Sequence, residues 1–196
     1  MKINTDIVKE LREKTGAGVI DIKEALEKSG GDMNRAVDFL RKKGEKIVQK
    51  KQARQTHQGL VVSYMHTNNR VAALVAIACE TDFVARNEEF KNLAKDIAMQ
   101  VVAFSPTYLE PSEVPPEILE KEKEIMREQL KAEGKPEKIR EKIMAGKINK
   151  FYEEVCLLKQ PFIKDDKKTI DALIKEKIAI LGENIKIRRF VRLSLD

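Results

Sequence analysis

The 196-residue sequence has no tryptophan, and aromatic residues make up only 5% of it. Proteins that bind single-stranded nucleic acid usually stack bases on aromatic side chains, so this composition argues against direct nucleic-acid binding. No apolar run approaches the roughly 20 residues that a membrane-spanning helix needs. The first residues, MKINTDIVKELREK, also lack the apolar segment of a secretory signal peptide. We therefore expect a cytoplasmic protein without membrane contact.

Residues that usually hold metals or perform covalent chemistry are scarce. Two cysteines, Cys79 and Cys156, lie far apart in apolar surroundings, which favours buried, reduced thiols over a disulfide. Two histidines, His57 and His66, have no cysteine or carboxylate cluster near them, so we expect no bound metal. The sequence has no phosphate-binding glycine loop, dinucleotide fingerprint or HExxH motif. We expect neither a cofactor nor a catalytic site, although an enzyme with a spatial triad stays an alternative.

The charged residues are numerous but mixed in sign. Lys and Arg number 38 against 32 Asp and Glu, which gives a net charge of +6. The densest basic stretch, residues 42–54, is typical of a solvated helix end and linker. It also leaves open an RNA- or ribosome-binding function, which predicts an affinity that falls steeply with salt concentration.

The first 45 residues predict a small three-helix bundle. Apolar residues recur at helical spacing in three segments, separated by turns at residues 15–18 and 29–31. Asp32 is expected to cap the third helix and Gly44 to end it. Residues 46–58 are polar and basic and are predicted to form a linker, and a helical first part of this linker stays open. A generic adaptor built on this bundle is a further alternative function.

Residues 59–196 predict an α+β core. Valine-rich segments at residues 60–66 and 71–79 form a hairpin whose second strand is expected to be buried on both faces. The last strand, residues 184–195, alternates between an apolar face, expected to be buried, and a basic face, and completes a three-stranded antiparallel sheet. Helices with apolar periodicity are expected at residues 87–101, 117–133, 136–146, 148–158 and 167–181. Two of them have narrow apolar stripes, so we expect a projecting helical hairpin at about residues 117–146.

Two segments are unusual. LREKTGAGVIDIKEAL, residues 11–26, places a tight glycine-containing turn between two helices. Val19 and Ile20 lie near this turn and either close the bundle or form a small docking face. ETDFVARN, residues 80–87, follows the buried strand as a loop. Phe83 in this loop is either a hydrophobic staple near a helix start or an exposed aromatic anchor of the kind that forms binding hot spots.

Together these segments resemble the elongation factor Ts family. LREKTGAGVIDIKEAL is similar to the N-terminal signature of that family, and ACETDFVARNEEF is similar to its core signature. LLKQPFIKDDKKTI and GENIKIRRF are also similar to family segments, in the same order along the chain. The resemblance implies a ubiquitin-associated-like (UBA-like) N-terminal bundle, a dimerisation-type α+β core and exchange of GDP for GTP on elongation factor Tu.

The resemblance also implies a binding site. Family members insert an Asp-Phe pair, here Asp82 and Phe83, between helices of the GTPase and disturb its magnesium and phosphate site, while the bundle grips another face. The implied GTPase contacts are Thr81, Asp82, Phe83, Val84, Arg86, Asn87, Leu11, Arg12, Val19 and Ile20. Longer members carry the core subdomain twice, whereas this chain has one copy. One copy leaves an apolar face and a strand edge uncovered, so we expect a twofold-symmetric homodimer.

Overall fold

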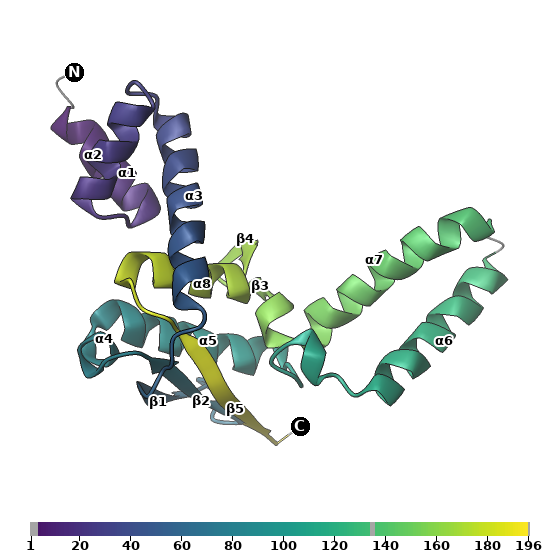
Figure 1. Cartoon of the computed structure of the whole chain (residues 1–196). Helices are drawn as coiled ribbons and strands as arrows, with labels where there is room; N and C mark the ends of the chain where they lie inside the picture. The colour runs from purple at the N-terminus through teal and green to yellow at the C-terminus, as the bar shows by residue number, and fades with distance from the viewer. Residues whose placement is uncertain (1–3, 134–135, 196) are drawn as a thin grey trace. The chain divides into compact units, whose positions relative to one another are not determined.

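The structure is a computed structural model that describes residues 4–133 and 136–195 (Figure 1). It confirms the α+β class, because helices are combined with a three-stranded antiparallel sheet. The chain divides into two compact units, each built from segments that are distant in sequence. One unit comprises Met1–Val61, Ala76–Ala94 and Ala172–Arg188, and the other comprises Val62–Val75, Lys95–Asp171 and Arg189–Asp196.

The first three helices contact one another pairwise. They are α1 (Thr5–Thr15), α2 (Val19–Lys28) and α3 (Met33–Lys51). Asn4 caps α1 by accepting a hydrogen bond from the Asp6 N–H (3.0 Å), and Asp32 caps α3 by accepting one from the Arg35 N–H (2.9 Å). The helices share an apolar core of Val8, Leu11, Ile22, Ala25, Leu26 and Ala36. The UBA-like character of this bundle stays a prediction.

Helix α3 is longer than predicted. Gly44, the expected end of the helix, lies inside it, and the helix continues to Lys51, so the first part of the predicted linker is helical. A Cβ on residue 44 would lie 3.2 Å from the Cβ of Ala179 in α8 (Ile170–Leu181), so glycine permits close packing there. The predicted end was wrong because Gly44 serves the close contact with α8, a tertiary contact that no local sequence pattern reveals.

The sheet has the strand order β1–β2–β5. Its strands are β1 (Gln58–Met65), β2 (Val71–Cys79) and β5 (Lys186–Ser194). β1 and β2 form the predicted hairpin, and the His66 N–H donates to the Val71 carbonyl (3.0 Å) at its turn. The Leu195 N–H donates to the Arg70 carbonyl (3.0 Å), so the end of β5 meets the start of β2, as antiparallel pairing requires.

One face of this sheet is exposed and apolar. The large exposed apolar side chains on it within the second unit, which we call the open sheet face, are Met65, Leu74, Val191, Leu193 and Leu195. The expectation that both faces of β2 and the apolar face of β5 are buried is therefore wrong for this part of the chain. Arg192, on the other side of β5, instead lies against α5 (Glu88–Phe104), because its Nε donates to the Val102 carbonyl (3.4 Å).

The helices next to the sheet carry the apolar stripes that the sequence predicts. Asn87 begins α5, since its Oδ1 accepts a hydrogen bond from the Glu89 N–H (2.8 Å). The buried residues of α5 are Phe90, Leu93, Ala94, Ile97, Ala98, Val101 and Val102. Those of α8 are Ile170, Leu173, Ile174 and Ile178.

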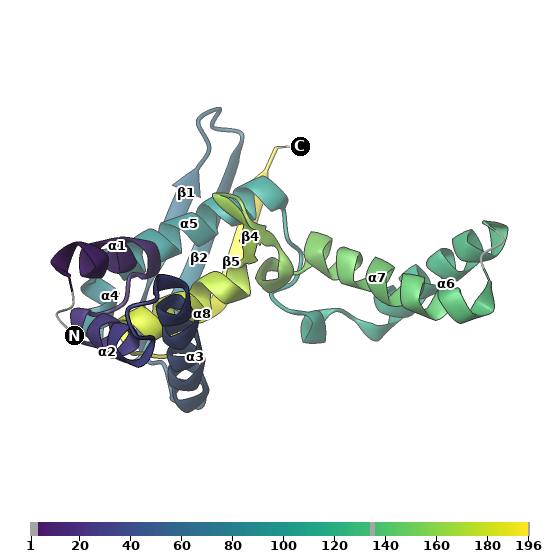
Figure 2. The same cartoon turned by 90° about the horizontal axis from the view of Figure 1, so that it is seen from above.

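The charged helices α6 (Pro116–Ala132) and α7 (Glu137–Val155) lie side by side (Figure 2). The prediction of a break near Gly146 is wrong, because α7 runs through this residue as one helix. A further departure follows α7: the strands β3 (Pro161–Phe162) and β4 (Asp165–Thr169) form a small hairpin that the sequence analysis missed. The helix expected from residue 167 therefore begins later, at Ile170.

Two buried glutamines tie the segments around β3 together. Gln100 Nε2 donates to Gln160 Oε1 (3.2 Å) and to the Pro161 carbonyl (3.1 Å), and Gln100 Oε1 accepts from the Ile163 N–H (2.9 Å). Gln160 Nε2 donates to one carbonyl of α5 (3.5 Å) and one of α7 (3.1 Å). Buried amides are costly unless they are hydrogen-bonded, and this pair meets that need internally.

Candidate partner-binding site

The turn between α1 and α2 carries one part of the candidate site. Gly16 ends α1 in the left-handed conformation (φ +64°), and its N–H donates to the Arg12 carbonyl (2.8 Å). Val19 begins α2 and is exposed, and Ile20 beside it is 82% exposed. Side chains that closed the bundle would be buried, so these exposures favour the docking-face interpretation.

Leu11 does not lie on that surface. Its side chain is fully buried in the core of the bundle, whereas Arg12 beside it is exposed. Leu11 therefore supports the bundle from within. The residues of this predicted set that a partner can reach are Arg12, Val19 and Ile20.

The segment after β2 is a short helix, α4 (Asp82–Arg86), rather than the predicted loop. Thr81 caps it: the Thr81 Oγ1 accepts from the Val84 N–H (3.4 Å), and the Thr81 carbonyl accepts from the Ala85 N–H (3.2 Å). None of the residues of α4 is buried. A helix this short is unstable by itself in water, so the interactions at its ends must maintain it.

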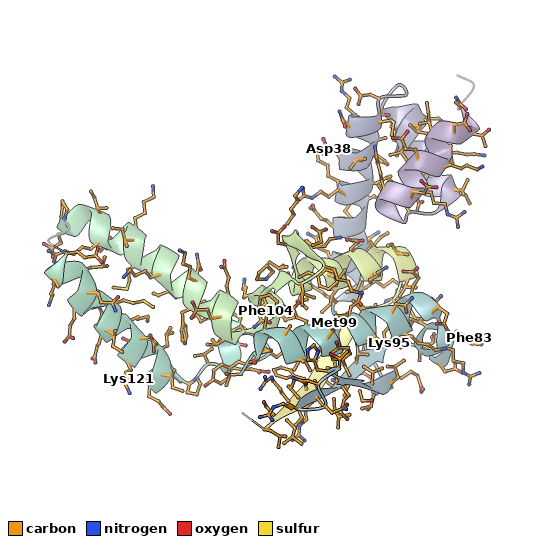
Figure 3. The ribbon with its side chains drawn as sticks, turned by 180° about the vertical axis from the view of Figure 1, so that it is seen from behind. Asp38, Phe83, Lys95, Met99, Phe104 and Lys121 are labelled. Carbon is orange, nitrogen blue, oxygen red and sulfur yellow. The ribbon has the colours of Figure 1, made fainter. Side chains whose placement is uncertain are left out.

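Phe83 is the large apolar side chain of α4. It is 80% exposed, and Figure 3 shows it at the surface. A hydrophobic staple would pack against the helix that it precedes, so this exposure is inconsistent with a staple. The free protein instead presents an aromatic side chain to solvent, as expected for a binding anchor.

The polar residues of α4 interact locally. Asp82 Oδ2 accepts from an Arg86 guanidinium nitrogen (3.0 Å), an i,i+4 ion pair between two exposed side chains. Such a pair contributes about 0.5 kcal/mol or less. A partner can therefore take Asp82 away from Arg86 at little cost. The Asn87 N–H donates to the Val84 carbonyl (3.0 Å), so Asn87 closes α4 as well as capping α5.

Two carboxylates that the sequence analysis did not single out hold the start of α4. Glu183 accepts hydrogen bonds from the N–H groups of Glu80 (3.1 Å) and Thr81 (3.0 Å) and from the Thr81 hydroxyl (2.6 Å). Glu80 in turn accepts from the Asn184 N–H (2.7 Å). Glu183 and Asn184 belong to the GENIKIRRF segment, but nothing in that segment signals a contact with residues 80–81.

The Glu80 carboxylate is stabilised in its ionised form. Burial acts to raise the pKa of Glu80, but the hydrogen bonds from the Asn184 N–H and from the Arg54 guanidinium (3.1 Å) hold the pKa below its ordinary value. The group is therefore an acceptor at neutral pH, with both oxygens engaged.

The described residues contain no group of three or more His, Cys, Asp or Glu side chains arranged to hold a metal ion. Burial raises the pKa of both the Cys79 and the Cys156 thiols to about 11, so neither supplies a thiolate at neutral pH. Within residues 4–133 and 136–195, no helix is long and apolar enough to cross a bilayer.

Comparison with known proteins extends the resemblance to the whole chain. The family model described as elongation factor TS matches residues 1–196. The elongation factor Ts proteins of Thermodesulfovibrio yellowstonii and Syntrophus aciditrophicus are 53% and 55% identical to this chain over 195 residues, covering 100% of it and 97% of each relative. That of Thermosipho melanesiensis is 51% identical over 193 residues, 98% of both chains. The chain therefore belongs to the elongation factor Ts family of translation elongation proteins.

Proposed function

We propose that this protein releases GDP from elongation factor Tu by inserting Asp82 and Phe83 beside the magnesium and phosphate site of the GTPase. Membership of the family supports the partner and the exchange activity. The wedge is supported by the 80% exposure of Phe83 on a helix whose start is tied down by Glu183. A large aromatic side chain kept out of the core on such a segment is suited to fill a pocket on a partner.

Exchange of this kind needs no covalent chemistry in the factor. A factor that weakens nucleotide binding by some ratio is itself weakened by nucleotide in the same ratio. A thousandfold weakening corresponds to about 4 kcal/mol, whereas burial of one phenylalanine contributes about 2–3 kcal/mol. Phe83 is therefore a main contributor but not a sufficient one, and the charge of Asp82 near the magnesium and phosphates supplies part of the rest. GTP then displaces the factor by mass action.

The accessible residues of the bundle turn form a second contact with the same GTPase. Val19 and Ile20 offer apolar surface, and Arg12 offers a charge beside them. Contacts that are equally good with and without nucleotide add affinity but do not expel the nucleotide. Ile20 therefore serves attachment, whereas Phe83 serves displacement.

The open sheet face supports a homodimer of this factor. Contiguous exposed apolar side chains on a folded domain mark interaction sites. The chain carries one copy of the core segments that longer members carry twice, so a second copy of the same chain is the occupant that we propose for this face. Twofold symmetry would place each open sheet face against the other.

Release of a fluorescent GDP from elongation factor Tu, with magnesium present, tests the exchange function. Wild-type protein is expected to accelerate release strongly, and Phe83→Ala and Asp82→Ala are expected to slow it. Losing the burial of Phe83 alone corresponds to roughly a 30- to 150-fold effect. Phe104→Ala is a matched control, because Phe104 is also partly exposed but lies at the far end of α5.

Thermal melting of each variant separates loss of function from loss of folding. Because Phe83 is mostly exposed, Phe83→Ala is expected to change the free energy of unfolding by only about 0.5 kcal/mol. A well-folded wild-type protein that does not accelerate GDP release would reject the exchange function. Salt-dependent RNA binding would then be the next property to measure.

A further inference from the structure

The start of α4 is held by a carboxylate from the other end of the sequence. Glu183 follows Gly182, which has a left-handed φ of +70°, and its side chain reaches the residues between β2 and α4. One carboxylate oxygen accepts from two successive N–H groups, those of Glu80 and Thr81, at 3.1 and 3.0 Å. The other accepts from the Thr81 hydroxyl at 2.6 Å. The carboxylate thus fixes both the backbone and the side chain of Thr81.

The hydroxyl contact also sets the direction of the Thr81 side chain. A hydroxyl has one hydrogen to donate, and here the carboxylate of Glu183 takes it. The lone pairs of Oγ1 are then available to the Val84 N–H at 3.4 Å, which is the N-cap bond of α4. Glu183 therefore selects the hydroxyl orientation in which Thr81 can cap the helix that carries Phe83.

The contact is reciprocal. Glu80 accepts from the Asn184 N–H (2.7 Å), so residues 80–81 and residues 183–184 each contribute a carboxylate to the backbone of the other pair. The Asn184 side chain is buried, and its Nδ2 donates to the carbonyls of Gln52 (3.2 Å) and Arg54 (2.8 Å) just after α3. We call this set of bonds the carboxylate clasp.

We propose that Glu183 is a positioning residue for nucleotide exchange: through the carboxylate clasp it holds α4 in one orientation, so that Phe83 is preformed for its pocket on the GTPase. This inference rests on the exchange function proposed above. α4 has five residues and buries none of them, so the bonds at its start replace the packing that orients longer helices. A preformed segment binds more tightly because less conformational entropy is lost on association.

Glu183→Gln tests the clasp with almost no change of shape. The glutamine has one acceptor oxygen and one NH2 group, so it cannot accept from both the backbone N–H groups and the Thr81 hydroxyl. If the NH2 group faces the hydroxyl, the hydroxyl accepts from it and its own hydrogen is free to rotate, so the charge-assisted bond that fixes Oγ1 toward the Val84 N–H is lost. Thr81→Val removes the hydroxyl, whereas Thr81→Ser keeps it. Glu120→Gln on α6 is a charge-matched control, because Glu120 pairs with Lys123 of its own helix and takes no part in the carboxylate clasp.

Amide hydrogen exchange in the free, full-length protein reads out the clasp without any partner. Glu183→Gln and Thr81→Val are expected to speed exchange of the Val84 and Ala85 amides about tenfold, the size of effect that an N-cap has on a helix end. Thr81→Ser and Glu120→Gln are expected to leave it at the wild-type rate. Unchanged Val84 protection in Glu183→Gln would overturn the proposal, whatever the activity.

GDP release then separates positioning from general support of the fold. Glu183→Gln is expected to raise the factor concentration for half-maximal release about tenfold and to leave the maximal rate unchanged, since a seated Phe83 acts as before. In the Phe83→Ala background the same substitution is expected to have no further effect, because there is no aromatic side chain left to orient. An equal loss in both backgrounds would overturn the positioning role. A wild-type protein that releases no GDP would overturn the exchange function, and this role with it.

Discussion

A single leucine on the open sheet face is expected to control formation of the proposed homodimer. Leu193 is 76% exposed in the single chain. Full burial of a leucine contributes about 1.5–3 kcal/mol, so covering the exposed part of Leu193 contributes about 1–2 kcal/mol. Twofold symmetry brings the side chain from both copies, which doubles the contribution to about 2–4 kcal/mol per dimer. Leu193→Ala is therefore expected to raise the dimer dissociation constant roughly 30- to 700-fold.

Leu193→Lys is expected to have a still larger effect, because association would place two like charges in an apolar interface. Sedimentation velocity from nanomolar to high micromolar concentration measures both variants beside the wild type. Ile139→Ala is the matched control, since Ile139 is an exposed apolar residue of α7 outside the open sheet face. The reasoning is refuted if the wild type stays monomeric throughout, or if Leu193→Lys dimerises as tightly as the wild type.

Two further predictions concern the buried cysteines and two glycines with positive φ. Burial raises the pKa of both the Cys79 and the Cys156 thiols to about 11. At pH 8 both thiols are therefore expected to resist a thiol reagent until the chain unfolds. Their contribution to the free energy of unfolding is complete below about pH 9 and is expected to be lost as the pH rises toward 11. Rapid labelling of either thiol in folded protein would contradict this. Gly59→Ala is expected to lower the free energy of unfolding, measured in urea, by more than Gly30→Ala. Both glycines have positive φ, but a Cβ on residue 59 would lie 2.1 Å from the carbonyl oxygen of Ile77, whereas a Cβ on residue 30 would meet open space. Gly30→Ala should cost about 1–2 kcal/mol, and equal costs would show that the close strand approach is unimportant.

Much of the fold follows from local patterns, and the departures share a tertiary cause. The apolar stripe of α5 and the β1–β2 hairpin are present where the sequence predicts them. Helix α3 passes Gly44 because of its close contact with α8, which lies more than a hundred residues later. Alternation in β5 is real, but periodicity shows only that two sides differ. It does not show that the side with Leu193 lies uncovered in a single chain.

The candidate site could be predicted only in part from the sequence, because tertiary contacts decide which of its residues are exposed. Phe83 and Ile20 were identified, and both are exposed. Leu11 belongs to the same segment as Ile20 but lies in the core, because residues of one helix point in different directions. The helical form of α4 was missed, since its cap depends on Glu183, whose contact with Thr81 no local pattern encodes.

The buried pair of Gln100 and Gln160 limits which substitutions related chains can accept at these two positions. A leucine at position 160 would leave two backbone carbonyls without their donor and Gln100 with one partner fewer. Each such buried orphan costs about 1–3 kcal/mol, a large share of the stability of a typical domain. Substitution of either glutamine alone is therefore expected to destabilise the protein. Substitution of both requires coordinated replacements that also give the Ile163 N–H a new acceptor. Positions 100 and 160 are expected to be inherited as one unit.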